Sequence, residues 1–523
     1  MSDRPGAVDR PGAPSVKTWA WWAAVALACI VPALPLLLTE VPPLSDYPNH
    51  LARMWFLGTQ TRDPAMAAML APAWGLLPNL GVDAVLPWVM RVVPVHVAGR
   101  AMLAVILMLP VLGAVALSTA TFGRRSFWAL GAALVTCHAL FLLGFLNFGL
   151  SVGLSMLAGA AWFRFRERWP VATVAGAVVA ACLLFFCHLM GVAFFLLLVG
   201  ACEAERCWAE RSVLRRAAAV AVVVAGPAAL YVSTALHGTG GPTIFASWGV
   251  KGRFAIYPVL NYALWLDVAT AVLIAGVVIA GVATGRLLVP LRWRVVLGVL
   301  LVLFAVAPVT VKGLSYVDAR FSVLLALGLF AGLQPIRVPR RMAALVGAGA
   351  LALLLGRTAL VGSLWREYDA EVTDVRAVIA GIEPGARVLP VWGEPAAPGL
   401  SGRLMADGTM VDWHLPAVVM IDRRAFWPYM FADPGQQPVR WLGDYATLAR
   451  DTPGLVRPRM LSGVQPPDAA EFPLWQTWQA RYDYVLLIEI GGPRTGAMGA
   501  GWLEPLAHRS LATLFRMRGH PQG

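Results

Sequence analysis

TEVPPLSDYPNHLARMWF, residues 39–56, is the stretch around which the rest of the chain is organised. It follows the first long apolar run and carries Asp46, His50 and Arg53 at spacings of four and three residues. In a helix, this spacing places His50 and Arg53 on one face, with Asp46 near the N-terminus. A carboxylate, an imidazole and a guanidinium beside a membrane could bind a phosphate-bearing substrate and move a proton. The alternative is a capped helix whose charges only mark the lipid boundary.

The composition is that of a polytopic membrane protein. Of the 523 residues, 59% are hydrophobic and 14% are charged, whereas a soluble protein carries about 25% charged residues. The net charge of +13 does not require nucleic acid as a partner, because Lys and Arg of membrane proteins gather in cytoplasmic loops. The six cysteines lie in apolar runs or in one short basic loop, which indicates neither a disulfide framework nor a cysteine metal site.

Apolar runs long enough to cross a bilayer recur through the first two thirds of the chain. The first covers residues 17–39 and is interpreted as an uncleaved anchor behind a disordered tail, residues 1–16. Residues 40–96 contain no clean span and predict a large first outer loop with helices along the interface, at 64–70 and 82–92. Further runs bring the prediction to about eleven spans; they cover 97–118, 127–143, 146–163, 170–186, 188–202, 215–235, 262–284, 291–310, 319–335 and 342–363.

The distribution of basic residues predicts the orientation of these spans. With the N-terminus inside, 18 basic residues before residue 364 fall in cytoplasmic segments and 7 fall in outer segments; the cytoplasmic segments are 4–17, 124–125, 164–168, 206–216, 286–294 and 337–341. This bias follows the positive-inside rule. An odd number of spans then places the C-terminus outside. We expect a multi-pass protein of the bacterial inner (plasma) membrane with a cytoplasmic N-terminus and a periplasmic, extracytoplasmic C-terminal domain.

The last third of the chain changes in character. After residue 363 the apolar runs shorten, and Asp, Pro and Trp become more frequent. Helical spacing over 364–379 and strand-like stretches at 386–392, 415–421 and 482–490 predict a small α/β domain. The predicted division is therefore a tail at 1–16, a membrane domain at 17–363 and an extracytoplasmic α/β domain at 364–523.

Most of the remaining unusual polar residues fall near the predicted outer side. His188 lies in a tight turn, Lys251 and Arg253 close a Gly-rich loop, and Lys312, Asp318 and Arg320 surround the start of a late span. Ionisable groups at membrane depth are costly and usually face a cavity. The alternative is structural: His188 bonds a neighbouring helix, and Asp318 and Arg320 cap and anchor their helix.

Signatures of several soluble enzyme classes are missing. The sequence contains no GxxxxGK[ST], HExxH or CxxC motif, so it gives no support to an ATP-driven protein or a zinc protease.

Three features resemble the GT-C class of membrane glycosyltransferases, especially the bacterial branch related to protein mannosyltransferases and aminoarabinose transferases. One is the acidic residue just outside the first span, Asp46 in SDYPNHLAR, which leads into a large outer loop. Another is an Arg–aromatic pair at the outer start of a late span, Arg320 and Phe321 in DARFSVLLALGL. The third is the layout of about eleven spans and an outer C-terminal α/β domain. The sequence departs from relatives with paired acids in this loop, because Tyr47 follows Asp46 and the nearest other acid is Glu40.

The resemblance implies a mechanism. The donor would be a sugar on a polyprenyl phosphate embedded in membrane lipid, and the acceptor a glycan, lipid or protein. Asp46 would take the proton of the acceptor hydroxyl, and His50 could share in handling the proton or the phosphate. The resemblance implies no certain cofactor. A divalent cation is an alternative, but the missing second acid beside Asp46 argues against a metal-chelating role. The residues assigned to binding substrate or its phosphate are Arg53, His188, Lys251, Arg253, Lys312, Asp318 and Arg320.

Two other functions remain open from the sequence. A transporter or lipid flippase predicts polar residues through the bilayer midplane and often an internal repeat, and no repeat is visible in this sequence. A non-catalytic assembly protein for envelope polysaccharide would keep the layout and tolerate loss of Asp46.

Overall fold

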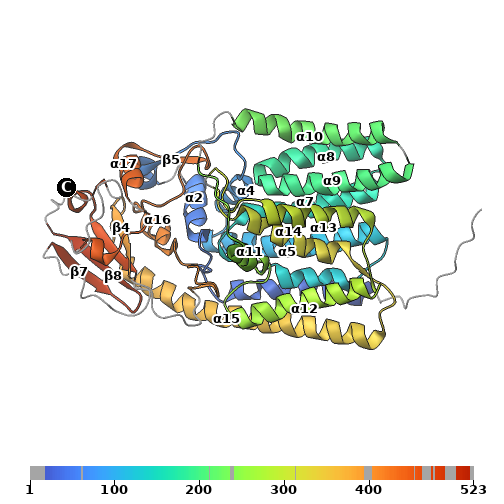
Figure 1. Cartoon of the computed structure of the whole chain (residues 1–523). Helices are drawn as coiled ribbons and strands as arrows, with labels where there is room; N and C mark the ends of the chain where they lie inside the picture. The colour runs from blue at the N-terminus through green and yellow to red at the C-terminus, as the bar shows by residue number, and fades with distance from the viewer. Residues whose placement is uncertain are drawn as a thin grey trace, which may run out of the picture.

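The structure is a computed structural model that describes residues 18–59, 63–210, 212–235, 241–312, 314–393, 403–452, 454–461, 473–474, 477–488 and 502–518. Long helices form a bundle, and a smaller part with short helices and strands covers one end of it (Figure 1). We call this end the site end. The tail predicted at residues 1–16 lies outside the described residues. The predicted class, a helical polytopic membrane protein with C-terminal strands, is confirmed.

Seven segments of the described chain are long and apolar enough to cross a membrane. They are α1 with η1 (Thr18–Leu37), α5 (Val95–Phe122), α7 (Leu146–Phe165), α8 (Pro170–Cys187), α10 (Val213–Ala235, spanning to Thr234), α12 (Leu264–Ala283) and α15 (Arg340–Ile379). The predicted runs also coincide with three shorter or more polar helices, α9 (Leu189–Glu210), α13 (Leu291–Val306) and α14 (Val317–Gly332). The run predicted at 127–143 is broken into a 3₁₀ helix, η2 (Phe127–Val135), and the short α6 (Ala139–Leu142).

Exposed tryptophans mark the two ends of the bundle. At the site end, Trp88, Trp248 and Trp265 are exposed, and at the opposite end Trp169 and Trp208 are exposed. Tryptophan is enriched at membrane–water interfaces, where its ring lies among the lipid head groups. The two groups are therefore consistent with a bundle that crosses the membrane from one to the other.

Small residues allow the central helices to approach closely. A Cβ on Gly153 of α7 would lie 2.4 Å from Cβ of Leu109, and one on Gly113 of α5 would lie 2.6 Å from Cβ of Met156. Membrane helices have little hydrophobic drive to associate in lipid, so close backbone contact stabilises them instead. This pair therefore forms the centre of the bundle.

The first loop forms helices at the two predicted places, 64–70 and 82–92, and also a short strand that was not predicted. After η1 (Val31–Leu37), it contains α2 (Tyr47–Thr59), α3 (Pro64–Met69), β1 (Leu70–Pro72) and α4 (Gly81–Val89). β1 pairs antiparallel with β5 (Val439–Trp441), which lies more than 350 residues later in the sequence. The loop and the C-terminal part are therefore joined at the site end.

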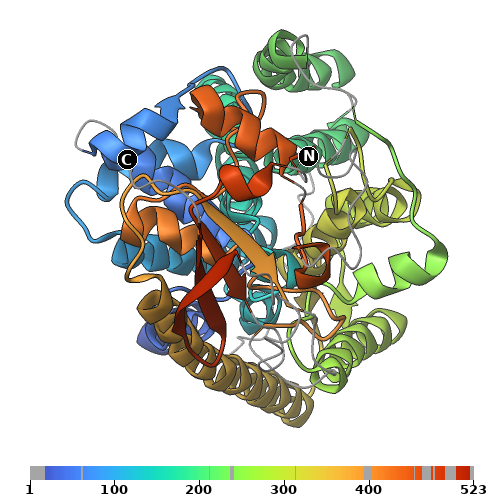
Figure 2. The ribbon, with the colours of Figure 1, turned by 90° about the vertical axis from the view of Figure 1, so that its left-hand side faces the viewer.

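The C-terminal part contains a mixed sheet. Strand order is β4-β6-β8-β7, with β4 (Val388–Trp392) parallel to β6 (Tyr484–Ile488), and with β8 (Ala512–Met517) antiparallel to both β6 and β7 (Leu503–His508). α15 runs through the predicted domain boundary at residue 363 without a break and reaches the sheet (Figure 1). Figure 2, viewed from this side, shows the C-terminal part lying over the end of the bundle.

The strands predicted at 386–392 and 482–490 correspond to β4 and β6, but the strand predicted at 415–421 is wrong. That segment is η3 (Leu415–Ala417) followed by α16 (Val418–Arg423). A fully buried apolar run has no periodicity that separates strand from helix, and Pro416 in the first turn favours a helix start. The remaining elements are α11 (Trp248–Ala255), β2 (Leu287–Leu288), β3 (Gln334–Pro335), α17 (Gly443–Asp451), α18 (Pro458–Leu461) and η4 (Trp478–Ala480).

Candidate active site

Asp46 precedes α2 and is held by the turn that joins α6 to α7. Its N–H donates to the carbonyl of Leu143 at 3.1 Å, and the N–H of Ser45 donates to the carbonyl of Leu142 at 2.8 Å. Gly144 has φ +83°, and a Cβ there would lie 2.8 Å from the Asp46 nitrogen, so the turn requires glycine. The Asp46 side chain is 22% exposed, and its carboxylate is therefore within reach of a substrate.

The C-terminal part supplies a titratable neighbour to Asp46. Nδ1 of His414 lies 3.2 Å from Oδ1 of Asp46, although the angle is not that of a hydrogen bond. The imidazole is buried and packs edge-on against the rings of Trp427 and Phe431, at centroid distances of 5.5 and 5.0 Å. No motif distinguishes His414 in the sequence, and only the fold brings it to a residue more than 360 positions earlier.

Asn49 fixes α2 to the same C-terminal segment. Its Nδ2 donates to the carbonyl of Tyr429 at 2.9 Å, and its Oδ1 accepts from the N–H of Phe431 at 2.8 Å. The ring of Phe431 then contacts the imidazoles of both His50, at 5.4 Å, and His414, at 5.0 Å. α2 and the C-terminal segment thus form one wall of the site.

His50 is neutral at this wall. Its Nδ1 lies 2.9 Å from Nη2 of Arg53, and because arginine only donates, the imidazole proton is on Nε2. Burial, followed by the charges of Arg53 and His414, lowers the pKa of His50 well below its ordinary value. His50 therefore brings no positive charge to a phosphate, and we no longer assign it that role.

Arg53 is also not available as a phosphate ligand. Its Nε and Nη2 donate to the two carboxylate oxygens of Asp83 at 2.7 and 3.0 Å, and both side chains are buried. Such a two-point pair fixes geometry as well as charge. Arg53 therefore ties α2 to α4, which is a structural role.

Lys251 and Asp318 likewise pair with each other. Nζ of Lys251 donates to Asp318 at 3.0 Å and to the carbonyls of Phe304 and Ala307 at 3.0 and 2.8 Å. These three acceptors use all three protons of the ammonium group. The prediction that Lys251 and Asp318 bind substrate is therefore not supported by their contacts.

Arg320 differs from these cations. The residue is 8% exposed, and its guanidinium lies over the ring of Phe145 at 5.1 Å. Within the described chain, its Nε has no hydrogen-bond partner and no carboxylate forms an ion pair with it. Phe145 belongs to the turn that also binds the Asp46 backbone. Residues 142–145 therefore connect a reachable carboxylate and a guanidinium without an acidic partner.

Tyr316 links the two groups. It adopts φ +61° before α14, and its ring meets those of Phe145 and Tyr257 at 5.9 and 6.2 Å. Burial, followed by the carboxylates of Asp407 and Asp46, raises the pKa of the Tyr316 phenol. Tyr257 donates to Oδ2 of Asp407 at 2.8 Å, so the C-terminal part brings a second carboxylate to the same region.

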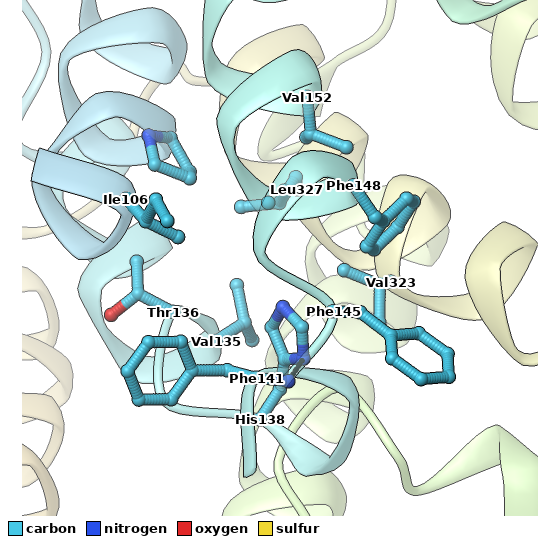
Figure 3. A pocket seen from close by; sticks show the side chains of 12 residues that line it. Ile106, Val135, Thr136, His138, Phe141, Phe145, Phe148, Val152, Val323 and Leu327 are labelled. Atoms are coloured by element: carbon cyan, nitrogen blue, oxygen red, sulfur yellow. Dashed lines mark hydrogen bonds between the residues drawn. The ribbon is translucent and has the colours of Figure 1, made fainter. Parts of the chain in front are cut away.

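A small cavity lies beside Phe145. Figure 3 shows His138, Phe145, Phe148 and Val323 around it. Its volume is about 10 Å³, which is room for about one water molecule. His138 caps α6, because its Nδ1 accepts from the N–H of Phe141 at 3.1 Å. The cavity is too small for a substrate and is not the binding site itself.

Of the other predicted residues, His188 lies close enough to Arg320 that burial, followed by the charge of Arg320, lowers the pKa of the imidazole well below its ordinary value. His188 lies between α8 and α9, where its Nδ1 accepts from the N–H of Met190 at 3.0 Å. Arg253 and Lys312 are exposed near the site end. Glu40, the other acid of the first loop, pairs with Arg376 and not with the Asp46 site. Among the described residues, no three His, Cys, Asp or Glu side chains are grouped to hold a metal ion.

Comparison with known proteins gave structural likeness only. The sequence matches no protein-family model, and the search of curated proteins gave no match. The crystal structure of ArnT from Cupriavidus metallidurans bound to undecaprenyl phosphate aligns at a TM-score of 0.48 and 13% identity over 95% of this chain and 98% of ArnT. The apo ArnT structure gives 0.47 and 13% over the same shares. A cryo-EM structure of the arabinofuranosyltransferase AftD from Mycobacteria gives 0.47 and 14% over 98% of this chain and 42% of AftD.

These neighbours are GT-C glycosyltransferases, the class that the sequence motifs resemble. At TM-scores below 0.5 and identities of 13–14%, the likeness says nothing about the side chains of the site. What the site does must therefore be inferred from its own side chains.

Proposed function

We propose that the protein is a membrane glycosyltransferase that moves a sugar from a polyprenyl-phosphate donor to an envelope acceptor at the outer face of the membrane. The observation that carries the proposal is the turn at 142–145, with Asp46 held on one side and Arg320 on the other. A base for a hydroxyl and a cation for a phosphate are the two groups that this reaction needs. In this proposal, the phosphate of the lipid meets water at the level of these two groups.

The reaction is a displacement at the anomeric carbon. The acceptor oxygen attacks this carbon while the bond from the carbon to the phosphate oxygen breaks, with inversion. The hydroxyl proton passes to the Asp46 carboxylate. The departing polyprenyl phosphate gains negative charge, which the planar guanidinium of Arg320 can meet with two parallel hydrogen bonds.

The remaining partners follow from this assignment. The polyprenyl tail lies between spans in the membrane lipid, and the exposed Arg253 and Lys312 attract the phosphate to the site end. The acceptor, a glycan, lipid or protein, enters from the side of the C-terminal part. The reaction as written requires neither nucleic acid nor a metal-bound step.

The test is transfer of label in membrane vesicles. Vesicles with wild-type protein receive polyprenyl-phosphate sugars that carry radiolabel in the sugar, and loss of label from the lipid is followed. We expect transfer by wild type and none above background by Asp46→Asn. Asp63→Asn is the matched control, because Asp63 caps α3 in the same loop and asparagine caps equally well. Full transfer by a correctly inserted Asp46→Asn variant would refute the base, and no transfer by inserted wild type with any donor would favour a transporter or an assembly protein.

A further inference from the structure

Asp46 has a fixed neighbour that the proposed reaction has not used. His414 is 8% exposed as a side chain, and its Nδ1 lies 3.2 Å from Oδ1 of Asp46. That nitrogen has no hydrogen-bond partner in the described structure. A buried polar atom without a partner is uncommon in folded proteins. A slight rotation of either side chain would bring this nitrogen into a hydrogen bond with the Asp46 carboxylate.

The surroundings of His414 hold its ring in place. Trp427 and Phe431 contact it edge-on, and Asn49 fixes the backbone of Phe431 to α2. A side chain locked by packing keeps its partner within a narrow range of geometry. The ring is therefore placed to orient one oxygen of Asp46 and leave the other free.

We infer that His414 is the positioning residue of Asp46: its Nδ1–H donates to Oδ1 in the working state, and Oδ2 takes the proton of the acceptor hydroxyl. This inference rests on the proposed transferase function. His414 keeps its own proton throughout, and the proton taken from the hydroxyl leaves Oδ2 to water after transfer. The site is then complete only when the C-terminal part is docked on α2.

A hydrogen bond to a carboxylate favours its charged form, so removing the donor raises the pKa of the acid. Other ionisable groups also face this pair. They are His50 from α2 and Tyr316 before α14. A substitution at His414 removes one of the charges that lower the pKa of His50, but burial remains the largest cause and keeps this imidazole neutral in every variant. His414 does not act on Tyr316.

The experiment compares pH profiles of sugar transfer for wild type, His414→Phe and His414→Asn in the full-length protein. His414→Phe retains a ring between Trp427 and Phe431 but has no donor. We expect kcat to fall roughly 10- to 100-fold, with little change in donor KM, and the acidic limb of the profile to move upward by about one pH unit. His414→Asn places an amide N–H near the position of Nδ1 and should recover most of the rate and the wild-type profile.

His508→Phe is the matched control, because it makes the same change in β7, where Nδ1 of His508 contacts Oγ1 of Thr513 at 2.8 Å. Its profile should be that of wild type. An unchanged profile and rate for folded His414→Phe would overturn the inference, and so would failure of folded His414→Asn to recover activity. If His414→Phe does not fold, His414→Leu, which likewise has no donor, is compared with His414→Asn under the same criteria. Absence of transfer by wild type would instead count against the proposed function.

Discussion

One buried charge at each end of the bundle, Glu203 at the opposite end and Arg320 at the site end, shows a contrast in how the protein compensates it. At the opposite end, Glu203 accepts hydrogen bonds from Trp162, Arg206 and Arg216 at 3.1–3.2 Å. At the site end, Arg320 is similarly buried but has no acidic partner in the described structure. Asp46 there has a histidine of the C-terminal part, His414, at 3.2 Å.

This difference indicates that Glu203 has a structural role and that Arg320 has a role in binding a ligand. Removing an ion from water costs several kcal/mol unless a partner replaces the water. The network around Glu203 provides that compensation within the protein and needs no ligand. Arg320 has no such compensation among the described residues, so binding of a negatively charged ligand is the simplest explanation for its buried position. Four substitutions can break or sharpen this comparison.

Asp46→Asn should have the largest effect. A positioned base contributes roughly 10²- to 10⁴-fold to a rate, and the amide cannot accept the proton. Because Asp46 is partly exposed, the variant should fold and melt as wild type does. The measurements are transfer rate and thermal unfolding of the same detergent-solubilised preparation. Loss of activity together with a large drop in Tm would contradict a chemical role.

Glu203→Gln should act on stability. It leaves the arginines around it without their shared carboxylate, and breaking a buried ion pair costs about 3–5 kcal/mol. We expect a lower Tm and less inserted protein, with an unchanged donor KM in the fraction that folds. If this variant were as stable as wild type, the opposite end would not be the structural network described here.

Arg320→Gln should show the reverse pattern. It removes a charged phosphate ligand, worth about 1.5–3 kcal/mol, so donor KM should rise roughly 10- to 100-fold. Stability should stay the same or increase, because no ion pair is broken. Arg320→Lys should recover part of the affinity, since it keeps the charge but not the planar fork. A strong loss of stability with an unchanged donor KM would mean that Arg320 is structural.

Asp412→Asn should give the smallest effect, and one that depends on pH. Burial raises the pKa of Asp412 from 3.8 to about 6. Between these values the folded state binds more protons than the unfolded state, so wild-type stability falls as pH rises through this window. An asparagine amide does not ionise, so Asp412→Asn avoids the loss of stability that comes with ionising a buried carboxyl group. Asp412→Asn should therefore be more stable than wild type by on the order of 1–2 kcal/mol above pH 7, and the gain should vanish near pH 4. A gain independent of pH would contradict the titration.

The course of the chain was largely predictable, because hydrophobic runs of span length leave few alternatives in a bilayer. Asp46 and Arg320 were also predictable, since each stands at the end of such a run. The phosphate-binding role predicted for Arg53 and Lys251 stays a prediction, and their contacts in the structure do not support it. Their buried partners Asp83 and Asp318 are found only when helices pack, and sequence does not say which cations are already neutralised.

His414, Asp407 and Tyr316 could not be found from sequence. They reach Asp46 through contacts between segments hundreds of residues apart, such as the pairing of β1 with β5. The domain boundary predicted at residue 363 does not divide the membrane bundle from the C-terminal part, and the reason again lies in the packing of the folded chain. α15 continues through it, and the buried core extends from the bundle into the C-terminal part.

The most direct test of the central claim is to measure binding and transfer separately on the same purified proteins. A long-chain polyprenyl phosphate is titrated into wild type, Asp46→Asn and Arg320→Gln, and sugar transfer is assayed in parallel. The account predicts that Asp46→Asn binds the lipid phosphate like wild type but transfers no sugar, and that Arg320→Gln binds it at least tenfold more weakly. Transfer by Asp46→Asn at the wild-type rate, or unchanged binding by Arg320→Gln, would contradict it.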